Sequence, residues 1–173
     1  MRGPATVNGR RSGRRREPHP APGGGPRRRP AIGKVGRGVP SARCSEPPPP
    51  EVAHGFEQFN RGEFFEQHET LEDAWIAETD PIRYLYQGIL QVGVGLYHLE
   101  RRNLYGAARL MTRGIALLQP FRPSCMTVDV ERFVAEAERC LAAVRALTPE
   151  TVESFDRALM PRVVYGDRAG ATG

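Results

Sequence analysis

The stretch FNRGEFFEQHETLEDAW, residues 59–75, holds the densest pattern of apolar and ionisable side chains in this 173-residue chain. An α-helix turns by about 100° per residue, and on that geometry five apolar side chains from the stretch and the residue after it share one broad face. These side chains are Phe64, Phe65, Leu71, Trp75 and Ile76. The pattern predicts a helix over residues 63–78 that packs this face into a core.

Ionisable side chains interrupt the apolar face. His68 and Glu72, one turn apart, fall in its middle, and Glu69 falls on its flank. A carboxylate that is buried without a partner costs on the order of several kcal/mol, so these groups need hydrogen bonds, a metal ion or a water-filled pocket. The helix is therefore the first candidate for a functional site.

The same reasoning predicts five more helices, from apolar periodicity, capping residues and prolines. They cover residues 51–60, residues 81–101, residues 104–119 behind Asn103, a segment that follows Thr127 or Asp129, and a shorter sixth helix from Thr148 to Pro161. No run alternates in the manner of a strand. The predicted fold is all-α, a compact bundle of about five to six helices built from helical hairpins.

Composition divides the chain near residue 51. Residues 1–50 hold 12 basic and 2 acidic side chains, a net charge of +10, whereas residues 51–173 hold 13 and 18, a net charge of −5. The first segment is mostly Arg, Gly and Pro and cannot bury enough apolar surface to offset its ordering entropy. We expect a disordered tail over 1–50, a single helical domain over 51–165 and a frayed end over 166–173. The tail could also contact nucleic acid through its arginines, act as a transit peptide, or stem from a wrongly chosen start codon.

Cysteine usage and hydropathy bear on the setting of the protein. The chain has an odd number of cysteines, Cys44, Cys125 and Cys140, and none of them has CxxC spacing. Neither a disulfide framework nor a thiolate metal site is therefore indicated. A reducing, cytoplasmic setting is expected. The longest uncharged segment, Tyr84–Leu99, has sixteen residues, and about 20 are needed to span a bilayer, so no membrane span is predicted.

The helix predicted over 81–101 is apolar almost all round and is expected to lie at the centre of the bundle. Its glycines cost helix stability, and close contact with a neighbouring helix is the expected compensation. Gln87, Gln91 and His98 nevertheless align within about 40° on its surface. This is a second polar stripe on a helix that should be buried.

Three interpretations of these polar residues stay open. In the first, His68, Glu72, Gln87, Gln91 and His98 form a structural hydrogen-bond network between two helices. In the second, the same residues and Trp75 line a small-ligand or catalytic pocket, with His68 as the acid or base, Glu72 orienting it and Glu69 as a further candidate. In the third, His68, Glu72 and His98 bind a divalent metal ion as a His₂Glu set, because HETLE differs from the zinc motif HExxH only in placing Glu72 at the second histidine.

Residues 59–118 resemble the bacterial and plastid family known as domain of unknown function 309. The resemblance rests on FNRGEFFEQHE with Leu71-Glu72 and Trp75, on YQGILQV and LYH, and on NLYGAARL. It implies a compact all-helical domain with an uncharacterised role. The polar positions of the family pattern fall on His68, Glu69, Glu72, Gln87, Gln91 and His98, but the resemblance implies no catalytic assignment and does not cover the Arg-rich tail.

Together these observations predict a small helical-bundle protein whose buried His/Glu/Gln pocket binds a small ligand or a metal ion. The alternative is a non-catalytic helical interaction module in which the polar set is structural, with nucleic-acid contact by the basic tail. Whether the protein is an enzyme, and whether it pairs with itself or with another protein, stays open.

Overall fold

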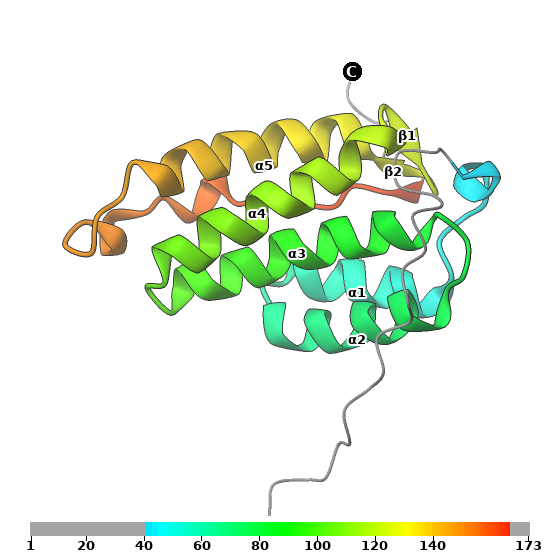
Figure 1. Cartoon of the computed structure of the whole chain (residues 1–173), viewed down its shortest axis with the longest axis horizontal. Coiled ribbons are helices and arrows are strands. Elements are labelled where there is room, and N and C mark those ends of the chain that lie inside the picture. The colour runs from blue at the N-terminus through cyan, green and yellow to red at the C-terminus, as the bar shows by residue number, and fades with distance from the viewer. Residues whose placement is uncertain (1–40, 167–173) are drawn as a thin grey trace, which may run out of the picture.

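The computed structural model describes residues 41–166 and contains five α-helices within them (Figure 1). They are α1 Pro50–Asn60, α2 Phe64–Ala77, α3 Arg83–Glu100, α4 Leu104–Leu118 and α5 Val130–Arg145. The all-α prediction is confirmed. Helices α1 to α4 begin and end within two residues of the predicted bounds, and α5 begins directly after Asp129. The predicted disorder of residues 1–40 and fraying of 167–173 lie outside the described residues.

Helix α3 is the centre of the bundle, with α2 packed on one side and α4 on the other (Figure 1). Helix α1 packs against α2, and α5 packs against α4. The glycines of α3 permit close approach, as expected: a Cβ atom on Gly95 would lie 2.6 Å from Cγ of Met111 in α4. On the facing helix, a Cβ atom on Gly114 would lie 2.6 Å from the backbone oxygen of Gly88.

The predicted sixth helix is wrong. The segment holds only two 3₁₀ turns, η3 Val152–Ser154 and η4 Arg157–Leu159. Between residues 151 and 159 only Val152 is buried, so the segment has no apolar face whose packing could stabilise a helix of this length.

Two further short elements connect α4 to α5. The 3₁₀ turn η2 Gln119–Phe121 extends α4, and strands β1 Ser124–Cys125 and β2 Val128–Asp129 form a two-residue antiparallel hairpin. Met126 and Thr127 at its turn both have positive φ, 50° and 60°, the conformation that matches the twist of a tight hairpin. Asn and Gly usually mark such a turn, and their absence explains why the sequence did not indicate it.

The N-terminal segment is tied to this hairpin. The 3₁₀ turn η1 Ala42–Ser45 precedes α1, and Cys44 forms a disulfide with Cys125 across 81 positions of sequence. The backbone N–H of Met126 also donates to the Cys44 carbonyl at 2.7 Å. The expectation that the cysteines show no disulfide is therefore wrong for this pair. Residues 41–50, which composition places in the tail, pack with the helical domain.

The C-terminal segment is held along α1. The side-chain amide of Asn60 donates to the Val163 carbonyl and accepts from the Val163 N–H, each at 2.8 Å. The Tyr165 hydroxyl donates to Glu57 at 2.7 Å, and its ring packs against Phe56.

Within residues 41–166, no helix has the length and apolarity that crossing a membrane requires.

Candidate functional site

Helix α2 buries a different polar residue from the ones predicted. Its buried side chains are Phe64, Gln67, Leu71 and Trp75, and the side chains of His68 and Glu72 are 38% and 35% exposed. Phe65, also expected inside, is 52% exposed. The prediction that His68 and Glu72 lie in the middle of the buried face is therefore wrong, because α2 is rotated so that Gln67 points inward instead.

His68 and Glu72 lie at the surface beside each other. Nε2 of His68 is 3.8 Å from Oε2 of Glu72, longer than a hydrogen bond. With Phe65, Glu69 and Asp73 they line a surface hollow of about 400 Å³, and all five residues come from α2. The carboxylates of Glu69 and Glu72 thus share a surface with an exposed aromatic ring.

The predicted polar stripe of α3 does not meet this pair. Nδ1 of His98 is 3.0 Å from Nδ2 of Asn103, the residue that caps α4, and no hydrogen bond joins His68 or Glu72 to Gln87, Gln91 or His98 among the described residues. Over residues 41–166 no group of three or more His, Cys, Asp or Glu side chains is placed to hold a metal ion. The described residues therefore do not bring His68, Glu72 and His98 together as a set of metal ligands, and a metal site made of them stays a prediction.

Gln67 is the most deeply buried polar side chain of the described residues. It has no exposed surface, and neither its Oε1 nor its Nε2 has a hydrogen-bond partner there. It fits because Gly93 of α3 has no side chain: a Cβ atom on Gly93 would lie 2.4 Å from Oε1 of Gln67. Gln67 was not among the residues predicted to be functional, although its spacing of four from Leu71 and eight from Trp75 matches a buried helical face.

Further unpartnered polar atoms lie along the same pair of helices. The indole Nε1 of Trp75 is buried without a partner, as are Nε and Nη2 of Arg83, whose guanidinium carbon lies 5.1 Å from the centre of the Trp75 ring. The side-chain carbonyl oxygens, Oε1, of Gln87 and Gln91 are buried and unpartnered as well. We call the interface between these two helices the α2–α3 seam. It extends from the contact of Gln67 with Gly93 to the contact of Trp75 with Arg83.

Two buried groups outside the seam are poor candidates for chemistry. Burial raises the pKa of the Cys140 thiol to about 12, so this cysteine is a thiol and not a nucleophilic thiolate at neutral pH. Burial likewise raises the pKa of Tyr86 to about 12, and its hydroxyl faces the sulfur of Met126 at 3.6 Å.

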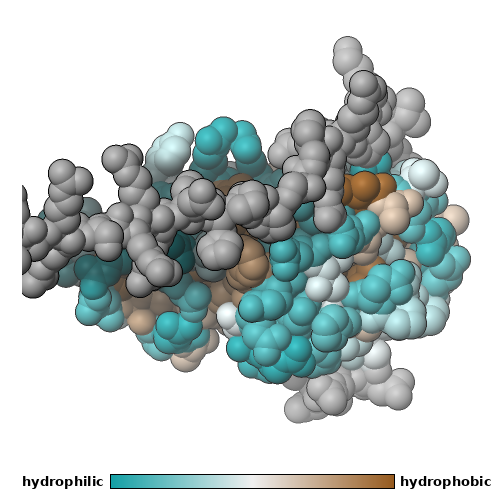
Figure 2. All heavy atoms as spheres, turned by 90° about the horizontal axis from the view of Figure 1, so that it is seen from below, coloured by the Kyte–Doolittle hydropathy of each residue, from teal (hydrophilic) through white to brown (hydrophobic). Residues whose placement is uncertain are grey.

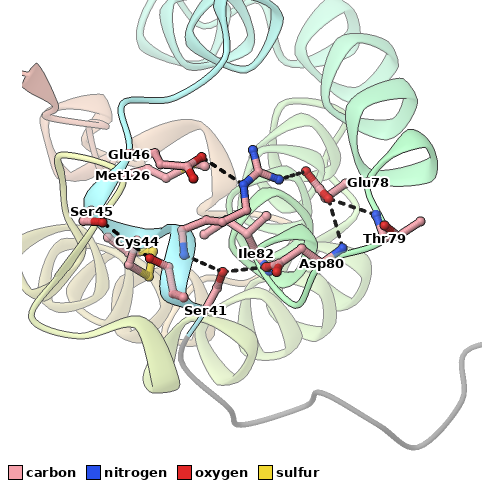
Figure 3. A network of polar contacts seen from close by, with 12 residues as sticks. Ser41, Cys44, Ser45, Glu46, Glu78, Thr79, Asp80, Ile82 and Met126 are labelled. Carbon is pink, nitrogen blue, oxygen red and sulfur yellow. Dashed lines mark hydrogen bonds and ion pairs between the residues drawn. A yellow bond between two sulfur atoms is a disulfide. The ribbon is translucent and has the colours of Figure 1, made fainter.

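The best-connected polar cluster lies where α2 meets α3 (Figure 3). Arg43 of η1 forms an ion pair with Glu78 at 2.5 Å, and the Ser41 hydroxyl donates to Asp80 at 2.5 Å. Burial alone would raise the pKa values of both carboxyls, but hydrogen bonds outweigh it and hold both below their usual range. For Glu78 the donors are the Asp80 N–H and Arg43, and for Asp80 they are Ser41 and the Ile82 N–H. These bonds hold the connection between α2 and α3 in shape and dock η1 on it.

The fold and the seam thus define a small helical domain with unpartnered polar groups between two antiparallel helices. Residues 52–110 match the family model described as "Domain of unknown function (DUF309)". The resemblance found in the sequence is confirmed for this part of the chain, which includes α1, α2, α3 and the first half of α4.

A curated relative is consistent with this resemblance. An uncharacterised protein of Bacillus subtilis (strain 168), YpuF, is 43% identical over 102 residues, which are 57% of this chain and 56% of that protein. The match therefore spans little more than half the length of the relative. No solved structure matches the chain.

Proposed function

We propose that the α2–α3 seam binds a small polar ligand and that Gln67 is its central contact. The observation that carries the proposal is the fully buried Gln67 amide, whose donor and acceptor both lack a partner. Such a group costs about 1–3 kcal/mol compared with a partnered one, whereas an apolar side chain of similar shape would cost nothing. A bound molecule that pairs with the amide would offset this cost.

The other unpartnered groups indicate the chemistry of that ligand. Trp75 and Arg83 offer N–H donors, and Gln87 and Gln91 offer carbonyl acceptors. A ligand with both amide-like donors and acceptors would complement this set, and a carboxylate on it would suit the guanidinium of Arg83. His68, Glu69 and Glu72 lie outside this site, in the surface hollow of α2, and a role for His68 as acid or base stays a prediction.

A non-catalytic interaction module is the second candidate. Exposed aromatic rings favour it, since Phe65 is 52% and Tyr105 77% exposed, and aromatic residues are enriched at protein interfaces. The structural-network form of this candidate has less support, because Gln87 and Gln91 leave their carbonyl oxygens unpaired instead of bonding to His68, Glu72 or His98.

Replacement of Gln67 by Met tests the proposal. Gln67→Met removes the unpaired amide at nearly constant volume, so the ligand-free protein should become more stable by about 1 kcal/mol, while ligand binding should be lost. Gln58→Met is the matched control, because Gln58 of α1 is also buried and its Oε1 is also unpartnered. The control should keep ligand binding.

Two measurements on the full chain decide the outcome. Native mass spectrometry detects a small molecule that co-purifies with the protein, and thermal unfolding with a panel of amide-bearing carboxylic acids detects binding as a raised melting temperature. Stabilisation of the wild type and the control, but not of Gln67→Met, would support the proposal. A less stable Gln67→Met protein, with no ligand effect on any of the three, would show a purely structural role.

A further inference from the structure

We propose that the outward face of α2 is the docking surface for the Arg-rich segment of the same chain, residues 10–29. The acidic face, as we call it, consists of Glu66, Glu69 and Glu72 together with the exposed ring of Phe65. It lies away from the buried Gln67 amide, so the inference does not depend on ligand binding at the seam.

Two carboxylates of the acidic face, those of Glu66 and Glu69, stand out because they have no arginine partner among the described residues. Helix α2 has four carboxylates and no Lys or Arg, and within residues 41–166 neither Glu66 nor Glu69 forms an ion pair. Elsewhere in that range many carboxylates are paired with an arginine. The pairs are Arg43–Glu46, Arg43–Glu78, Arg61–Glu63, Arg102–Glu153, Arg122–Glu131, Arg132–Glu136 and Arg157–Glu100.

An aromatic surface adjoins these carboxylates. The ring of Phe65 is 52% exposed, and its centre lies 6.1 Å from that of Tyr97 in α3. The guanidinium of Arg101 already lies over the Tyr97 ring at 5.3 Å and bonds to its hydroxyl. Guanidinium groups bind both to aromatic faces and, through two parallel hydrogen bonds, to carboxylates. The hollow beside Phe65, His68, Glu69 and Glu72 offers both kinds of contact.

The side of the molecule on which α2 lies suits a charged partner better than an apolar one. Figure 2 views the molecule from the side on which α1 and α2 lie, and its coloured part is mostly hydrophilic, with small separate hydrophobic areas. A partner for this side must therefore be held mainly by charge and hydrogen bonding, which arginine-rich sequence supplies.

The same chain carries such a sequence. Residues 10–29 include eight arginines and one acidic residue, and the net charges of +10 over 1–50 and −5 over 51–173 are opposite. The segment has no aromatic side chain for stacking on nucleic-acid bases. Carboxylates that lack basic partners are therefore a better match for it than a single-stranded nucleic acid.

The attachment point places this segment within reach. Ser41 bonds to Asp80 directly beyond the C-terminal end of α2, as Figure 3 shows, and Arg43 forms an ion pair with Glu78 there. The 14-residue helix is about 21 Å long. The eleven residues 30–40 span up to about 36 Å when extended, so residues 10–29 can lie anywhere along α2.

Paramagnetic relaxation in the full chain tests the inference. A nitroxide is attached through Ser12→Cys, since Cys44 and Cys125 are bonded and Cys140 is buried. Backbone amides over 64–77 should then lose at least half of their signal at low salt and recover at high salt, because screening weakens exposed ion pairs. Glu66→Gln/Glu69→Gln/Glu72→Gln should abolish the loss, and Glu138→Gln/Glu150→Gln, with two exposed carboxylates outside α2, should preserve it.

Three results would overturn the proposal. Signal loss spread over other helices, or retained in the α2 triple variant, would place the segment elsewhere. Signal loss only in mixtures of labelled and isotope-enriched chains would show that the segment binds a second copy. Unchanged spectra of the labelled chain at low salt would show that α2 does not bind it.

Discussion

Gly88 and Gly114 set how closely α3 and α4 approach. A Cβ atom on Gly114 would lie 2.6 Å from the Gly88 carbonyl oxygen and 2.8 Å from a methyl group of Val92. The first of these atoms is backbone, which cannot move aside as the end of a side chain can. The contact between the two helices therefore depends on the absence of two side chains.

Gly114→Ala should lower the free energy of unfolding by about 1–3 kcal/mol, because overpacking forces α3 and α4 apart. This loss is the net effect. Ala is favoured over Gly in a helix interior by roughly 1 kcal/mol, so the steric cost must exceed that gain. Urea denaturation measures the difference, and Gly114→Val should cost more than Gly114→Ala if the cause is steric. A raised denaturation midpoint for Gly114→Ala would show that the helices have room for a side chain.

At the scale of elements, a short segment is fastened to the joint of two helices. Turn η1 is held at the connection of α2 and α3 by the Arg43–Glu78 and Ser41–Asp80 contacts. Glu78 also accepts from the N–H groups of Thr79 and Asp80, each at 2.9 Å. One carboxylate thus supports the connection itself and the segment docked on it.

Acid should weaken this attachment. The folded-state pKa of Glu78 lies below its ordinary value of 4.5, so its ionised form stabilises the fold above that value, and the contribution fades as pH falls through the lowered pKa. Glu78→Gln should therefore be less stable than the wild type at about pH 6 and nearly equal to it at about pH 2. Urea denaturation at both pH values measures this, and an equal deficit at both would contradict the assignment.

At the scale of the whole molecule, the Cys44–Cys125 disulfide joins the N-terminal segment to the hairpin before α5. Cys44→Ser should lower the free energy of unfolding by about 2–4 kcal/mol, since the bond restricts the unfolded chain. Denaturation of the oxidised wild type against the variant measures the loss. Alkylation of the unfolded, unreduced wild type should modify a single thiol, that of Cys140, and modification of three would contradict the pairing.

This disulfide also removes one premise of the expected setting. Unpaired cysteines were the reason to expect a reducing compartment, and two of the three are bonded to each other. A cytoplasmic location stays a prediction, and the cysteines no longer support it.

Local patterns identified the helices but not their rotation. Asn103 and Asp129 accept the N–H groups of Gly106 and Arg132, as expected of capping residues. The apolar spacing of α2 was equally clear. The spacing left the rotation of α2 about its axis uncertain by about one residue position. A rotation by one position puts Gln67 at the buried face in place of His68.

The sequence alone determined the five helices, the central place of α3 and the resemblance to the family, because apolar spacing, capping and sequence motifs act over a few neighbouring residues. Only the tertiary structure decided that Gln67 is buried, because Gly93 of another helix makes the space for it. It also decided the Cys44–Cys125 pair, since residues 81 positions apart meet only when the chain folds. Contacts between distant segments depend on how whole helices pack, which no local pattern records.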